Sequence, residues 1–162
     1  MLVPMLPVEW FQAIELSWLG QLVRTSLWLF PVIEATHLLG LSALGGAVLL
    51  VDLRLWGVAM ADQPVATIVR GAHRWLVGSA VLMLSTGTLL FMSEAVKCYH
   101  NQAFWVKMVT IPVALTFTFA VRERLASRDG MHTGWQSRLL ATVNMGLWFT
   151  VAAAGRWIGL SS

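Results

Sequence analysis

The sequence is poor in charged residues and in cysteine, and both deficits limit the classes of protein to which the chain can belong. Only 12% of its 162 residues are charged, whereas 57% are hydrophobic and the mean hydropathy is +0.71. Soluble domains carry about 25% charged residues. The single Cys98 excludes an intramolecular disulfide and any CxxC metal or redox motif. This composition predicts an integral membrane protein.

Several functional signatures are also missing. The basic residues form no cluster interleaved with aromatic residues, so the net charge of +3 does not indicate nucleic-acid binding. The chain has no HExxH, P-loop or GxSxG motif, and no GxGxxG motif after a strand. Whether the protein is an enzyme stays open at this point.

Four apolar stretches are present, each close to the length of about 20 residues that a helix needs to cross a bilayer core. We expect spans at about 27–51, 75–92, 103–121 and 139–159. Residues 8–23 carry aromatic and aliphatic residues at helical spacing among polar ones, which predicts an amphipathic helix on the membrane surface or on a partner subunit. The predicted fold is an all-α integral membrane four-helix bundle with this surface helix, in one membrane domain over 1–162.

The basic residues predict the orientation of the chain. The loops after the first and third spans hold seven Lys and Arg residues, against four elsewhere. Because positive residues stay on the cytoplasmic side, both termini are expected outside. In a Gram-negative bacterium this would be a multi-pass inner-membrane protein with periplasmic termini. The loops are expected to hold a short helix ending near Gly71 and a turn at Asp129-Gly130.

A carboxyl and an imidazole lie inside the first apolar stretch. Glu34 and His37 are three residues apart, so they share a helix face. Ionisable groups at this depth need partners inside the bundle. Lys107 enters the third span from the outer side, and Arg156 lies near the outer end of the fourth. These four residues are predicted to converge in the outer half of the bundle.

Three roles for this cluster remain open. In the first, His37 ligates a b-type haem or another metal, Lys107 and Arg156 pair with propionates, and Glu34 tunes the histidine or relays protons. In the second, the cluster is a structural staple of ion pairs. In the third, it belongs to a transport pathway or a small-ligand site.

Further candidate ligands lie before the third span and in the loops. Tyr99 and Asn101 precede the third span on the outer side and are included as candidate cofactor-binding residues. His73, with His132, and separately His100 are further candidate metal or haem ligands. A second axial histidine at the depth of His37 is missing from the spans, which leaves Met92, Lys107 or His100 as a sixth ligand.

Five short motifs resemble those of a group of small bacterial inner-membrane proteins of unknown function. The motifs are FPVIEATHLLG (30–40), DLRLWG (52–57), TGTLLF (86–91), FWVK (104–107) after Tyr99 and Asn101, and Gly155-Arg156. More distantly, a histidine in the first span followed by glycines, with a lysine in the third span, resembles haem-binding membrane protoporphyrinogen oxidases. The histidine and glycines also resemble the copper-resistance D membrane domain. The matching residues here are His37 and Lys107, and this resemblance favours haem.

Taken together, these features lead to the expectation of a haem-b-binding membrane subunit. It would carry electrons between a periplasmic redox partner and the membrane pool, or anchor that partner. Lys107 and Arg156 would hold propionates or a quinone head group. The alternatives are a transporter for metal ions or small solutes, and a structural subunit of a larger complex without its own cofactor. A homo-oligomer formed through glycine-rich helix faces also stays open.

Overall fold

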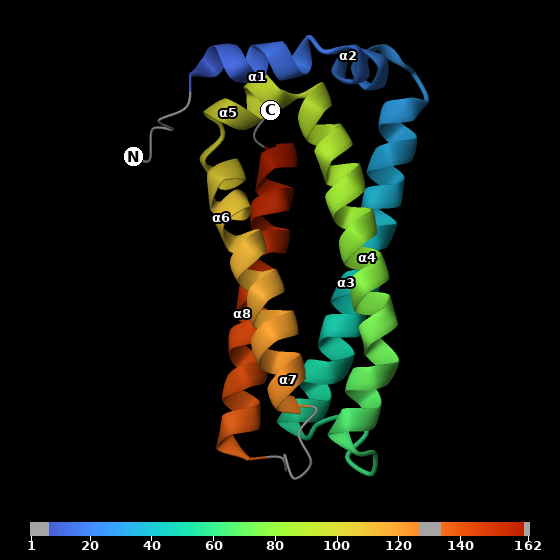
Figure 1. Ribbon diagram of the computed structural model, residues 1–162, viewed down its shortest axis with the longest axis vertical. Helices are drawn as coiled ribbons and strands as arrows, with labels where there is room; N and C mark the ends of the chain where they lie inside the picture. The colour runs from blue at the N-terminus through green and yellow to red at the C-terminus, as the bar shows by residue number, and fades with distance from the viewer. Residues whose placement is uncertain (1–6, 127–133, 161–162) are drawn as a thin grey trace.

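Four long helices that alternate in direction make up the body of the protein (Figure 1). The computed structural model describes residues 7–126 and 134–160. The long helices are, in chain order, α3 (Leu29–Trp56), α4 (Val65–Ser93), a third that runs through α6 (Gln102–Thr116), the π-helical segment η1 (Phe117–Arg122) and α7 (Glu123–Ala126), and α8 (Trp135–Leu160). The predicted all-α four-helix fold is confirmed.

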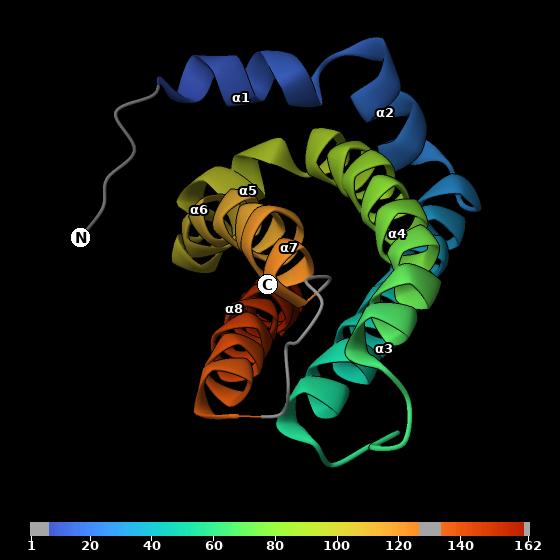
Figure 2. The ribbon, with the colours of Figure 1, turned by 60° about the horizontal axis from the view of Figure 1, so that its bottom comes forward.

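Three of the long helices have the length and composition of membrane spans: Leu29–Trp56, Val65–Ser93 and Gln102–Ala126. Helix α8 has 26 residues and is about 39 Å long at 1.5 Å per residue, which also exceeds a hydrocarbon core of about 30 Å. In the bundle α3 packs on α4, α6 packs on α8, and α3 and α8 join the two pairs (Figure 2). This is the arrangement expected of a multi-pass membrane protein.

Short helices cover one end of the bundle, which we call the outer end; the opposite end is the inner end. They are α1 (Val8–Glu15), α2 (Trp18–Thr25) and α5 (Ala95–His100). The single helix expected over residues 8–23 is therefore two helices. The break falls at Ser17, whose hydroxyl accepts from the Gly20 N–H as the N-cap of α2 and donates to the carbonyl of Ile14.

The collar formed by α1 and α2 packs on its own chain. Phe11 is buried against the rings of Phe91, Tyr99 and Trp105. One carboxylate oxygen of Glu15 pairs with Arg24, and the other accepts from the Val96 N–H, 2.8 Å away, at the start of α5. The collar still exposes Trp10 and Trp18, and Trp28 at the start of α3 is exposed too; tryptophan is favoured at a membrane–water interface.

The helices differ from the expected spans at their ends. Helix α4 begins at Val65 and passes through Gly71 without a break, so the separate short helix does not form. The third helix continues past Val121 to Ala126. The expected turn at Asp129-Gly130 lies outside the described residues. Helix α3 ends at Gly57, whose φ of 81° is left-handed and suits glycine.

Candidate functional site

His37 makes one side-chain hydrogen bond, through its Nδ1 atom. Its Nδ1 lies 2.8 Å from the Thr86 hydroxyl oxygen. That hydroxyl already donates its only hydrogen to the carbonyl of Leu82, 2.7 Å away. In the tautomer that satisfies both contacts, Thr86 accepts from Nδ1–H. The neutral imidazole then keeps its lone pair on Nε2, the state of a histidine that ligates a metal through that atom.

The backbone of α4 comes close to the same ring. A Cβ atom placed on Gly87 would lie 3.2 Å from Cε1 of His37, closer than ordinary side-chain contacts. Glycine at this position thus allows the imidazole to sit against α4. Thr86 and Gly87 are the first two residues of the TGTLLF motif, and His37 belongs to the FPVIEATHLLG motif. The two motifs therefore contact each other in the fold.

A second contact of this kind joins α6 and α8. A Cβ on Gly155 would lie 3.2 Å from the Lys107 Nζ atom. Lys107 is half-buried, and its charge acts on the His37 ring. Across residues 7–126 and 134–160 its ammonium group makes no hydrogen bond or ion pair. A partly buried cation without an anionic partner would be stabilised by an anionic or carbonyl-bearing ligand.

The other candidates of the outer half have different surroundings. Glu34 and Arg156 are exposed, and neither forms an ion pair within the described part of the chain. Asn101 is the N-cap of α6, because its side-chain oxygen accepts from the Ala103 N–H at 2.9 Å. The carbonyl of Tyr99 accepts from the Trp105 indole at 3.0 Å. Tyr99 and Asn101 thus shape the corner between α5 and α6, whereas His37 contacts α4 and Lys107 contacts α8.

The remaining histidines lie elsewhere. His73 pairs with Glu123 at 2.9 Å near the inner end, and half of its side chain is exposed. His100 is exposed beside the Tyr99 ring, and His132 lies outside the described residues. Within those residues, no group of three or more His, Cys, Asp and Glu side chains is placed to hold a bare metal ion.

A buried polar network in the inner half is the feature that sequence reasoning missed. Asp52 accepts from Arg122 Nη1 at 2.9 Å and from Asn144 Nδ2 at 2.7 Å. The Thr118 hydroxyl donates to Asn144 Oδ1 at 2.7 Å and accepts from the Trp148 indole at 2.9 Å. Asp52, Thr118, Arg122 and Asn144 are fully buried. Arg122 is therefore a core residue, although its position suggested a loop residue that closes the third span.

The π-helical segment η1 supplies two members of this network, Thr118 and Arg122. Such segments are rare and concentrate at functional sites. The sequence held partial signals: Asp52 begins the DLRLWG motif, and Asn144 interrupts an apolar stretch. The second charge of that motif, Arg54, does something else. It donates to the carbonyls of Gln63 at 2.7 Å and Ala61 at 3.3 Å, which holds the loop before α4.

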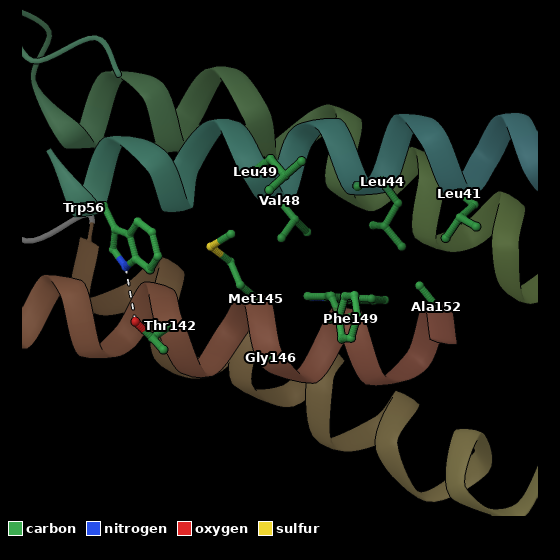
Figure 3. Close-up of a pocket in the computed structure, with 12 residues that line it drawn as sticks. Leu41, Leu44, Val48, Leu49, Trp56, Thr142, Met145, Gly146, Phe149 and Ala152 are labelled. Atoms are coloured by element: carbon green, nitrogen blue, oxygen red, sulfur yellow. Dashed lines mark hydrogen bonds between the residues drawn. The ribbon is translucent and has the colours of Figure 1, made fainter. Parts of the chain in front are cut away.

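An apolar groove runs between α3 and α8 (Figure 3). It has a volume of about 500 Å³. Leu41 and Leu44 face Phe149 and Ala152 across it, and Gly45 and Gly146 leave open space in its walls. Val48 and Trp148 belong to the groove and also contact the polar network. We call it the α3–α8 groove.

Comparison with known families gives one clear result: the model of the family of unknown function DUF6644 matches residues 9–161. The chain belongs to this family. No curated protein and no solved structure matches it. The expected membership in a family of unknown function is thus confirmed, and no relative links this DUF6644 chain to haem-binding oxidases or copper-resistance proteins.

The single cysteine of this DUF6644 chain is a buried, unreactive group. Cys98 lies in α5 behind the collar and is 8% exposed. Burial, with a contribution from the Glu94 carboxylate, raises the pKa of its thiol to about 11. Because only the thiolate is a good nucleophile or metal ligand, Cys98 is expected to react slowly near neutral pH.

Proposed function

We propose that this DUF6644 chain binds a b-type haem in the outer half of the bundle, with His37 Nε2 as an axial ligand of the iron. The observation that carries the proposal is the contact of Nδ1 with the Thr86 hydroxyl, which is compatible with a ring hydrogen on Nδ1 and a lone pair on Nε2 for the iron. A haem needs only one or two protein ligands, so this site suits it better than it suits a bare metal ion.

The surroundings of His37 supply what else a haem requires. Lys107 offers a propionate a positive charge that no residue of 7–126 and 134–160 pairs, and the exposed Arg156 at the outer end of α8 offers a second. Glu34, one helical turn outward from His37, is available to tune or protonate groups at the rim. His73 lies near the inner end of the bundle, so His37 is the one histidine at its depth among residues 7–126 and 134–160.

In this proposal the chain is a subunit of the bacterial inner membrane. Its outer end, with α1 and the end of α8, faces the periplasm, as the distribution of basic residues indicates. A bound haem supplies one-electron chemistry, and the chain passes electrons between a periplasmic redox partner and the membrane pool, or anchors that partner.

The geometry favours a bound cofactor over a transport path. The buried residues of α3 between His37 and Asp52 are all apolar: Gly40, Leu44, Ala47, Val48 and Val51. The two polar sites are therefore separated by about 22 Å of apolar helix face at 1.5 Å per residue. A cofactor needs only the outer site, whereas a transported ion would have to cross this layer.

The test is a dithionite-reduced minus oxidised visible spectrum of the chain purified from haem-supplemented cells. The wild type is expected to show the α-band of a b-type haem, and His37→Ala is expected to lose it. His73→Ala is the matched control and should keep the full band, because His73 pairs with Glu123 near the inner end. A wild-type spectrum without this band would contradict the haem proposal. The remaining functions would then be those of a structural subunit or a transporter.

A further inference from the structure

The α3–α8 groove ends beside an exposed arginine. Trp56 and Thr142 line the groove at its inner end, and the Trp56 indole nitrogen lies 3.2 Å from the Thr142 hydroxyl oxygen (Figure 3). The same indole donates to the carbonyl of Arg138, 3.1 Å away and one turn before Thr142 on the same face of α8. The Arg138 side chain is exposed, and no residue of 7–126 and 134–160 forms an ion pair with it.

The position of the groove along α3 places it in one leaflet of the bilayer. Trp28 and Trp56 mark the two ends of α3 and are separated by about 42 Å at 1.5 Å per residue. A bilayer with its headgroup regions is about 40–45 Å thick. Leu41, the groove residue of α3 farthest from Trp56, lies near the middle of that distance. The groove therefore runs from the headgroups at the inner end to about the middle of the bilayer.

The dimensions of the groove suit a hydrocarbon chain. From Leu41 to Trp56 the groove is about 22 Å long at 1.5 Å per residue. Its volume of about 500 Å³, spread over this length, corresponds to a width of about 5 Å, whereas a helix with its side chains is about 10–12 Å across. A helix of a second copy is too wide, and a single extended chain fits. All the lining residues except Thr142 are apolar, as an acyl chain requires.

The charge at the inner end determines which lipid fits. A phosphate pairs with a guanidinium through two parallel hydrogen bonds. Basic residues beside membrane-spanning helices attract anionic headgroups in this way. A zwitterionic lipid carries its own cation next to its phosphate, so its headgroup gains less from Arg138. The groove and the arginine together match a lipid with a net negative headgroup.

We propose that one anionic phospholipid, from the leaflet at the inner end, binds to this surface. Its phosphate pairs with the Arg138 guanidinium beside Trp56, and one of its acyl chains occupies the α3–α8 groove. The site uses neither His37 nor Lys107, so it does not depend on the haem proposal. The lipid would hold α3 and α8 together at the side where their side chains leave a gap.

The experiment is native mass spectrometry of the full chain, released from detergent micelles that contain phosphatidylglycerol or phosphatidylcholine. The wild type is expected to retain one phosphatidylglycerol and to bind it about fivefold more tightly than phosphatidylcholine. Arg138→Gln should lose this preference, because a basic residue near an anionic headgroup contributes about 1 kcal/mol, which is about fivefold in affinity. Arg70→Gln is the matched control. Arg70 is exposed near the start of α4, whereas α3 and α8 line the groove, so this variant should keep the preference.

Two glycine variants test the groove without changing any charge. Gly146→Leu places a side chain in the groove from α8 and is expected to weaken phosphatidylglycerol binding about tenfold. Gly78→Leu on α4 is its control, because a Cβ at either glycine meets nothing within 4 Å and Gly78 does not line the groove. It should bind the lipid as the wild type does.

Four outcomes overturn the lipid site. The first is equal retention of phosphatidylglycerol and phosphatidylcholine by the wild type. The second is the same lipid preference in Arg138→Gln and Arg70→Gln, and the third is equal binding by the two glycine variants. The fourth is a dimer that excludes lipid, which would mean that a second copy covers the groove. His37→Ala should retain the lipid normally, so failure of the haem proposal would leave this result intact.

Discussion

At the scale of single residues, the buried polar side chains divide by whether their hydrogen bonds are complete. Asn144 and Thr118 have a partner for each polar side-chain atom. Among the described residues, His37 has no partner for one ring nitrogen, Lys107 has no anion, and Arg122 has two nitrogens without a partner. Completed groups hold the bundle together, whereas incomplete ones mark where a ligand is expected.

The first prediction concerns the buried ion pair. Asp52→Asn leaves Arg122 as an uncompensated buried charge, and we expect it to lower the free energy of unfolding by about 3–5 kcal/mol. Asp62→Asn, in the exposed loop after α3, should change it by less than about 0.5 kcal/mol. Thermal unfolding in detergent measures both. A double variant Asp52→Asn/Arg122→Met should lose less than the sum of the two single changes, and additive losses would contradict the pairing.

The second prediction concerns Cys98. Its thiol pKa of about 11 and its 8% exposure mean that little thiolate exists at pH 8, so iodoacetamide should not label the folded chain there. Burial favours the neutral thiol, so labelling should rise only as the pH approaches 11. Mass spectrometry of the intact protein measures the adduct. Gln12→Cys in a Cys98→Ser background exposes a thiol on α1 and should label rapidly at pH 8.

At the scale of helices, two factors determine where each long helix begins and ends. One is the packing of its side chains in the core, and the other is the presence of residues that stop the helical backbone. Apolar runs predict where a chain can sit in lipid, so the central parts of α3, α4, α6 and α8 follow from the sequence. The first turns of α4 are polar, and they are helical because Val65, Val69 and Ala72 bury one face in the core. That face depends on neighbours that lie far away in the sequence.

The candidate site was predictable in the same partial way. His37 and Lys107 stand out because ionisable residues are rare in apolar stretches. Their partners Thr86, Gly87 and Gly155 are small residues of ordinary helices, and only the fold brings them together. Arg122 misled prediction, since an Arg at the end of an apolar run usually reaches water. The π-helical segment η1 carries it inward to Asp52.

The third prediction tests how the collar is attached. Gly20 of α2 lies against α4, and a Cβ there would be 2.7 Å from the carbonyl oxygen of Met92. Gly20→Ala must push α2 off the end of α4, because a backbone oxygen cannot move aside cheaply. We expect faster proteolysis at the turn around Ser17 and a lower Tm. Gly71→Ala on α4 meets open space and should change neither. Equal cleavage of both variants would contradict this attachment.

At the scale of the whole molecule, the two ends of the bundle have different chemistry. The outer end holds the collar, the aromatic cluster around Phe11 and the site of His37 and Lys107. The inner end holds the Asp52–Arg122 network and the loop fastened by Arg54. The proposed haem site lies near the outer end, so the side of the membrane from which a redox partner reaches it depends on which end faces the periplasm.

The last prediction settles that orientation. If the outer end is periplasmic, alkaline phosphatase fused after Ser162 should be active in cells, since this enzyme folds only outside the cytoplasm, where its disulfides form. The same enzyme inserted into the loop between Gly57 and Pro64 at the inner end should be inactive, and a green fluorescent protein inserted there should fluoresce. Arg70 and Arg74 near that loop are the basic residues expected to keep it on the cytoplasmic side. The reverse activities would place the His37 site on the cytoplasmic side, where a periplasmic electron donor has no access to it.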